Sequence, residues 1–318
     1  MEMPNRVVMS AMGTHEASVS EDGRMVTDKL IAYHVARAKG GCGLNTTECC
    51  AVDYASSPKG FLAISDDKYI PGMKKLCQAV HAVGGRMAVQ LWQGGLAVGS
   101  DPQAEILIPS DMPVSADYTM PGISVERLHS VIRAFGEAAR RAVEAGFDAV
   151  EFHCGHNYLP HSMLSGAINH RTDEWGGSLE NRMKFPLACI RSIRENIPKA
   201  MPLFMRVVWQ DDFLEGGLTP EDVIAFCKEA GKAGVDVINV SRGNVLSAAI
   251  MYETPPVDMP NGFNVDAAAR IREETGMLVM PCGRINTPGL AEEILEQDKA
   301  DLIVMSRAQL ADPEFCAK

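Results

Sequence analysis

Short apolar runs alternate with longer amphipathic stretches along the whole chain. The runs contain little polar alternation, which is typical of parallel strands that are buried on both faces. They cover residues 7–12, 43–48, 86–91, 148–153, 202–207, 236–241, 277–282 and 301–306. Buried strands that are separated by helix-length segments predict an α/β protein built on a parallel sheet.

The stretches between the runs have the spacing of amphipathic helices. Ile132, Phe135, Ala139 and Val143 recur at intervals of three or four residues, so they share one face of a helix. Gly146 follows this stretch, where a helix C-terminus favours a left-handed residue. Each strand is therefore expected to lead into a helix that covers the sheet.

Two folds fit this order of elements. A doubly wound sheet usually opens with a Gly-x-Gly-x-x-Gly turn, whereas Gly13-Thr14-His15 follows the first run here. The length of 318 residues suits one closed barrel, which commonly needs about 250. We therefore predict a (β/α)8 TIM barrel that forms a single domain over residues 1–318.

Charge and composition narrow the class of partner. The net charge of −11 would repel nucleic-acid phosphates and anionic lipid surfaces. No apolar run approaches the length of a membrane span, and the first residues lack the basic and apolar regions of a signal peptide. Cys49 and Cys50 are the only close pair among nine cysteines, so reduced thiols and a cytoplasmic location are expected.

In a barrel, the residues that follow each strand carry the chemistry. Gly283-Arg284 ends the seventh run and Ser306-Arg307 ends the eighth. Backbone N–H groups and guanidinium groups on neighbouring strands are suited to binding phosphate. The sequence therefore predicts a phosphorylated ligand.

The fourth run ends in His153, followed by His156 and Tyr158. One interpretation makes a histidine an ordinary core residue. A second makes both histidines donors to a substrate oxygen, with Tyr158 as a proton donor. A third makes the histidines metal ligands together with Glu48 or Glu151. The spacing alone leaves these alternatives open.

A polar, glycine-containing segment occupies residues 169–182. Its residue types predict a structured loop with a scaffold role, in which the charged side chains pair with one another. The expected members of these pairs are Arg171, Asp173, Glu180 and Arg182.

This segment reads NHRTDEWGGSLENR, and with Ser10-Ala11-Met12, Gln90-Leu91 and His153-x-x-His156-x-Tyr158 it resembles the Old Yellow Enzyme family of FMN-dependent ene-reductases. The resemblance covers nearly the whole chain. Residues 286–303 are most similar to a bacterial branch of this family. That branch contains 2,4-dienoyl-CoA reductases, 2-enoate reductases and bile-acid enone reductases.

The resemblance implies a hydride transfer from flavin N5 to the β-carbon of an α,β-unsaturated carbonyl or carboxylate compound. NADH or NADPH would first reduce the FMN. His153 and His156 would bind the substrate carbonyl, and Tyr158 would protonate the α-carbon. The implied FMN-binding residues are Ser10, Ala11, Met12 and Cys49 along the flavin, Gln90 and Arg206 at its pyrimidine edge, and Gly283, Arg284, Ser306 and Arg307 at its phosphate.

Several positions depart from the family's patterns. Gly13 stands where some relatives carry a redox-tuning cysteine, Gln93 replaces a histidine of trimethylamine dehydrogenase, and dienoyl-CoA reductases have a histidine near Val245. The iron-sulfur and FAD/NAD(P) domains of larger relatives are not in this sequence. A flavin-dependent amine dehydrogenase, against which Gln93 argues, and a non-catalytic flavin-binding remnant are the alternatives. The expected partners are a small-molecule substrate and, in a homo-oligomer, further copies of the chain.

Overall fold

Parallel strands close into a barrel in the computed structural model, which describes residues 1–318. The order around the sheet is β10-β9-β8-β7-β4-β2-β1-β11, and a parallel bridge between Cys282 and Val304 joins its two ends. This closure confirms the predicted TIM barrel and excludes a doubly wound sheet. The barrel strands are β1 (Val7–Met9), β2 (Leu44–Ala51), β4 (Met87–Trp92), β7 (Ala149–Cys154), β8 (Leu203–Val208), β9 (Val237–Ser241), β10 (Leu278–Pro281) and β11 (Ile303–Val304).

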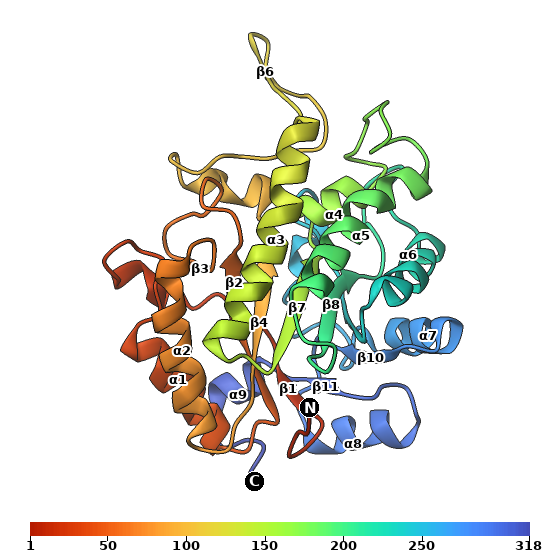
Figure 1. The fold of residues 1–318 in the computed structure, drawn as a ribbon. Coiled ribbons are helices and arrows are strands. Elements are labelled where there is room, and N and C mark those ends of the chain that lie inside the picture. Colours follow the sequence, from red (N-terminus) through yellow and green to blue (C-terminus); the bar gives the residue numbers. More distant parts are fainter.

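Three short strands lie outside the predicted apolar runs. Strand β3 (Leu62–Ala63) pairs with β2, and β5 (Met112–Ser115) forms an antiparallel hairpin with β6 (Tyr118–Met120). The hairpin projects from the body of the molecule, and both chain ends lie on the opposite side (Figure 1). Its side chains are largely exposed, so it carries no apolar run for sequence analysis to detect.

Helices follow the barrel strands and form the outer layer (Figure 1). None of them is both long enough and apolar enough to cross a lipid bilayer. The α-helices are α1 (Asp28–Lys39), α2 (Ile70–His81), α3 (Val125–Ala145), α4 (Leu159–Leu164), α5 (Leu179–Glu195), α6 (Pro220–Ala233), α7 (Val265–Thr275), α8 (Pro288–Glu296) and α9 (Arg307–Ala311). The 3-10 helices are η1 (Glu16–Val19), η2 (Asp67–Tyr69), η3 (Gly95–Ser100) and η4 (Ala248–Tyr252).

Local capping fixes where several helices begin and end. The Ser124 hydroxyl accepts a hydrogen bond from the Arg127 N–H at the start of α3. Thr219 and Asp222 form a capping box at the start of α6. Helix α3 ends at Gly146 with a φ of 89°, in the left-handed region that its sequence position predicts.

Two apolar layers hold the barrel. The larger layer lies between strands and helices, where Phe135 of α3 packs edge-to-face on Phe152 of β7 with ring centroids 5.1 Å apart. The smaller layer fills one end of the barrel interior. It takes a side chain from every barrel strand: Val8, Leu44, Ala88, Ala149, Phe204, Val237, Met280 and Val304.

The segment 169–182 is a hydrogen-bonded scaffold. Arg171 pairs with Asp173 at 2.5 Å and also donates to the carbonyls of Pro109 and Ile123. The prediction of pairing was wrong for Glu180 and Arg182. Arg182 donates to the Leu164 and Gly177 carbonyls, and Glu180 lies in the first turn of α5, where the helix dipole stabilises a carboxylate without a cation.

Candidate active site

The candidate site begins directly above the apolar layer inside the barrel. Ser10, Gln90 and Arg206 lie two residues beyond the layer's Val8, Ala88 and Phe204. Because successive side chains of a strand alternate between faces, residues two apart point to the same interior. A cavity of about 800 Å³ opens here. All the predicted site residues line it: Ser10, Ala11, Met12, Cys49, Gln90, His153, His156, Tyr158, Arg206, Gly283, Arg284, Ser306 and Arg307.

A bulge in β2 brings Cys49 to this cavity. The pairing register between β2 and β4 shifts between Thr46 and Cys49, and Cys49 then lies opposite Gln90. Its Sγ donates to Gln90 Oε1 at 3.1 Å. A bulge turns the following residues to the other face of a strand. Without it, the alternation that begins at Leu44 would direct Glu48 inward instead.

The two glutamates considered as metal ligands are held by other groups. Glu151 accepts from Gln90 Nε2 at 2.6 Å and from Asn239 Nδ2 at 2.7 Å. Glu48 accepts from the backbone N–H and the hydroxyl of Thr14. Both carboxylates therefore serve the internal hydrogen-bond network of the barrel.

Arg206 places a fixed positive charge on the floor of the cavity. Its side chain is buried, and it donates from Nη1 to Ser10 Oγ at 2.8 Å and from Nη2 to Ser241 Oγ at 3.2 Å. Its Nε is buried without a hydrogen-bond partner. A buried donor of this kind is costly unless a ligand satisfies it, so Arg206 favours a ligand with acceptor atoms.

His153 and His156 are held as neutral rings with defined donors. Burial lowers the pKa of both imidazoles, and the Arg206 charge lowers it further. His153 Nδ1 accepts from the Gly155 N–H at 3.2 Å, which leaves the ring proton on Nε2. His156 Nε2 lies 2.9 Å from Ser241 Oγ, whose hydroxyl can donate to it and leave the ring proton on Nδ1. With Ser241 as the donor to His156, each histidine keeps one N–H for a ligand.

The turn that carries these side chains has an uncommon backbone conformation, and a buried histidine holds it in place. His156 and Asn157 have φ values of 61° and 58°, a left-handed conformation that is uncommon outside glycine. The Asn157 N–H donates to His161 Nδ1 at 2.9 Å, and His161 Nε2 lies 3.0 Å from Asp211 Oδ1. Neither His161 nor Asp211 could be identified from the sequence, because no motif connects residues fifty positions apart.

Tyr158 stands beside the histidines against an aromatic wall. Its ring packs edge-to-face on His153 and on Trp92, with centroid distances of 4.8 and 5.3 Å. Phe61, which sequence analysis did not single out, stacks on Trp92 at 5.3 Å and also lines the cavity. Burial raises the pKa of Tyr158 far above its usual value, so its hydroxyl is protonated at neutral pH.

The opposite end of the cavity carries the two predicted phosphate-binding arginines. Gly283 has a φ of 106°, and Arg284 follows with a φ of 57°. Arg284 donates from Nη2 to Asn261 Oδ1 at 2.9 Å, and its Nε is buried without a partner. Arg307 donates from Nη2 to the Pro255 carbonyl at 2.8 Å. With Arg206 at the floor, these groups fit a ligand such as FMN that joins a polar ring system to a phosphate.

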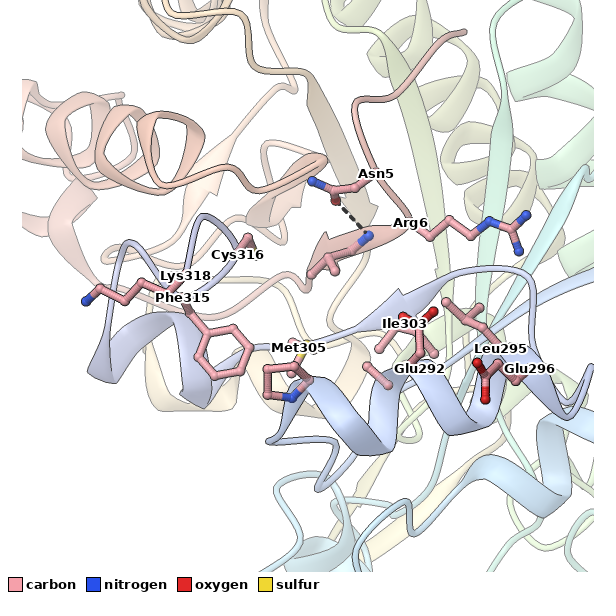
Figure 2. A pocket seen from close by; sticks show the side chains of 13 residues that line it. Asn5, Arg6, Glu292, Leu295, Glu296, Ile303, Met305, Phe315, Cys316 and Lys318 are labelled. Carbon is pink, nitrogen blue, oxygen red and sulfur yellow. Dashed lines mark hydrogen bonds between the residues drawn. The ribbon is translucent and has the colours of Figure 1, made fainter.

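A second cavity of about 620 Å³ lies outside the barrel, between α8 and the strands β1 and β11 (Figure 2). The Asn5 side chain beside it accepts from the Val7 N–H at 3.0 Å and is thereby used to hold the backbone. None of the predicted site residues lines this cavity. The chemistry-bearing side chains thus gather inside the barrel.

Buried histidines predict a loss of stability in mild acid. Burial lowers the pKa of His34 to about 4, and it also lowers those of His153 and His156. The unfolded chain, with histidine pKa values of about 6.5, binds more protons below that pH, so stability falls as pH drops through it. Between about pH 7 and pH 5.5 each histidine should cost about 1 kcal/mol.

Urea unfolding of the protein at the two pH values measures this loss. A His34→Gln variant should lose less stability on acidification than the unmodified chain. Equal stability at both pH values would contradict the prediction.

Comparison with known proteins finds relatives that match nearly the whole length of the chain. The sequence is 37% identical over 322 residues to an NADH oxidase of Thermoanaerobacter brockii, covering 99% of this chain and 48% of that protein. It is 36% identical to an NADPH dehydrogenase of Bacillus subtilis, covering 99% of this chain and 90% of that protein. A solved 2-naphthoyl-CoA reductase matches with a TM-score of 0.89 and 26% identity, covering 99% of this chain and 50% of that one.

The chain thus spans about half the length of the NADH oxidase and of the naphthoyl-CoA reductase. A family model described as the NADH:flavin oxidoreductase / NADH oxidase family matches residues 1–318. This match confirms the resemblance drawn from the motifs, and with it the predicted cofactor class of FMN with NADH or NADPH. The chain belongs to the NADH:flavin oxidoreductase / NADH oxidase family.

Proposed function

We propose that this protein is an FMN-dependent ene-reductase that acts on α,β-unsaturated carbonyl or carboxylate compounds. The observation that carries the proposal is the grouping of His153, His156 and Tyr158 at one cavity, with two neutral imidazole N–H donors beside a protonated phenol. Carbonyl polarisation needs such donors, and protonation of the α-carbon needs such an acid.

The residues of the cavity divide into two groups by chemistry. Arg284, Arg307 and the backbone at Gly283 would hold the FMN phosphate, and Arg206 would face the electron-rich pyrimidine edge of the flavin. The Gln90 amide, which Cys49 and Glu151 hold in place, would contribute at the same edge. When bound and reduced by NADH or NADPH, FMN supplies the hydride that the β-carbon of the substrate accepts.

The chain's own residues would then act on the substrate. His153 Nε2–H and His156 Nδ1–H would donate to the carbonyl oxygen and withdraw electron density from the double bond. Tyr158 would hold the proton that the α-carbon takes up. Phe61 would keep water from this end of the cavity, because its ring lines the cavity and stacks on Trp92, on which Tyr158 also packs.

The colour and redox behaviour of the purified protein test the proposal. We expect a yellow protein whose dithionite-reduced flavin is reoxidised anaerobically by cyclohex-2-enone. Reoxidation by the imine product of an amine, with none by the enone, would favour an amine dehydrogenase. A flavin that neither compound reoxidises would favour a non-catalytic flavin-binding protein.

Arg284→Ala is expected to weaken FMN binding about tenfold to a hundredfold. The substitution removes a charge-assisted contact to phosphate, worth about 1.5 to 3 kcal/mol. Titration of apoprotein with FMN, followed by quenching of flavin fluorescence, measures the dissociation constant. Arg270→Ala is a suitable control, because Arg270 pairs with Glu221 and Glu274 at the surface and does not line the cavity. An unchanged constant for Arg284→Ala would contradict the assignment.

A further inference from the structure

Glu253 is a cavity residue that no sequence motif singled out. It follows η4 in the long connection between β9 and α7, and its side chain lines the cavity with Tyr158 and Arg206. Gly243, just after β9, has a φ of 101°, and a Cβ there would lie 2.6 Å from the Glu253 backbone nitrogen. Glycine at this position therefore allows Glu253 to pack against the end of β9.

The same connection lies beside the turn that carries the histidines. Asn244 forms a parallel bridge with His156, and the Val245 N–H donates to the His156 carbonyl at 3.4 Å. Glu253 is therefore held on the wall next to His156 and Tyr158. Two residues further on, the Pro255 carbonyl accepts from Arg307 at the phosphate end.

The carboxyl of Glu253 is not used by the protein itself. Its Oε1 is buried without a hydrogen-bond partner. The other acid that lines the cavity, Asp312, pairs with Lys318 at 2.7 Å. A buried acceptor without a partner is costly, so a ligand that donates a hydrogen bond or carries positive charge is favoured beside Glu253.

We propose that Glu253 selects substrates by charge, favouring neutral or cationic unsaturated carbonyl compounds over carboxylates. The inference rests on the proposed ene-reduction, and it narrows the substrate class to enones and enals rather than enoates. An ionised Glu253 would lie in the same cavity as the substrate, where like charges repel more strongly than in water. We expect about tenfold discrimination against an anion.

The discrimination should increase as pH rises through neutrality. Burial raises the pKa of Glu253 to about 7, although the Arg206 charge opposes this rise. The other groups that face it do not titrate in this range. Burial raises the pKa values of Tyr158 and Cys49, which stay protonated, and it lowers those of His153 and His156, which stay neutral.

Benzoate and benzamide form a matched pair of anionic and neutral ligands for the test. Their dissociation constants with the oxidised holoenzyme are measured by the change in flavin absorbance at about pH 6 and pH 8. For the unmodified enzyme, the preference for benzamide should grow about fivefold between these pH values, because a carboxyl with a pKa of about 7 is mostly protonated at pH 6 and mostly ionised at pH 8. In Glu253→Gln the preference should no longer depend on pH, whereas Glu253→Asp should keep the dependence because it keeps the charge.

Glu296→Gln serves as the control, because Glu296 is exposed on α8 outside the barrel (Figure 2). A benzamide preference with the same pH dependence in Glu253→Gln as in the unmodified enzyme would overturn the inference. Failure of the proposed ene-reduction can be distinguished from failure of the charge selection, because cyclohex-2-enone would then not reoxidise the reduced flavin. In that case a preference that responds to Glu253→Gln would still assign Glu253 as a charge filter for ligands.

Discussion

Tyr158→Phe is expected to slow reoxidation of the reduced flavin by an enone at least about tenfold, while reduction of FMN by its donor stays within a few-fold. A positioned general acid contributes about a hundredfold to ten-thousandfold, and water can replace part of this. Burial raises the pKa of Tyr158, which makes the phenol a weaker acid that nevertheless stays protonated at neutral pH.

Stopped-flow measurement of the two half-reactions separates the expected effect on reoxidation from a loss of structure that would slow both half-reactions. Tyr118→Phe is the matched control, since Tyr118 is exposed on β6 and does not line the cavity. A Tyr158→Phe enzyme that is reoxidised at the unmodified rate would mean that Tyr158 only packs against Trp92 and His153. Another acid or solvent would then deliver the proton.

Replacing both His153 and His156 with Ala is expected to weaken phenolate binding about a hundredfold or more. A phenolate resembles the enolate that forms during reduction, and each imidazole N–H would donate to its oxygen. Hydrogen bonds to a charged group contribute about 1.5 to 3 kcal/mol each. Titration of oxidised enzyme with a para-substituted phenol, followed through the long-wavelength charge-transfer band, gives the dissociation constant.

His129→Ala is the control for this experiment, because His129 is exposed on α3. The double variant should keep its FMN, since neither histidine is placed at the phosphate end. A dissociation constant that does not change would leave the two histidines as structural residues of the cavity wall. Stoichiometric zinc in the purified protein, with no flavin, would support the metal-ligand interpretation instead.

The fold and most of the candidate site could be predicted from the sequence because their signals are local. Each barrel strand lies in or overlaps an apolar run, and Gly146 marks a helix end by its left-handed backbone conformation. His153, His156 and Tyr158 are neighbours in the chain, so one turn necessarily brings them together. Closure of a parallel barrel then gathers every strand end at a single face.

Tertiary structure decided the features that depend on contacts between distant segments. The bulge in β2 depends on pairing with β4 and determines that Cys49, rather than Glu48, reaches the cavity. His161 holds the left-handed turn and lies against Asp211, which is fifty residues away in the chain. Glu253 lies in a connection without a motif, and its burial and lack of a partner exist only once the barrel is assembled. The sequence therefore determined which reactive side chains are present. Their protonation, orientation and partners were decided by the tertiary structure, because desolvation and hydrogen bonding depend on neighbours that the chain order does not specify.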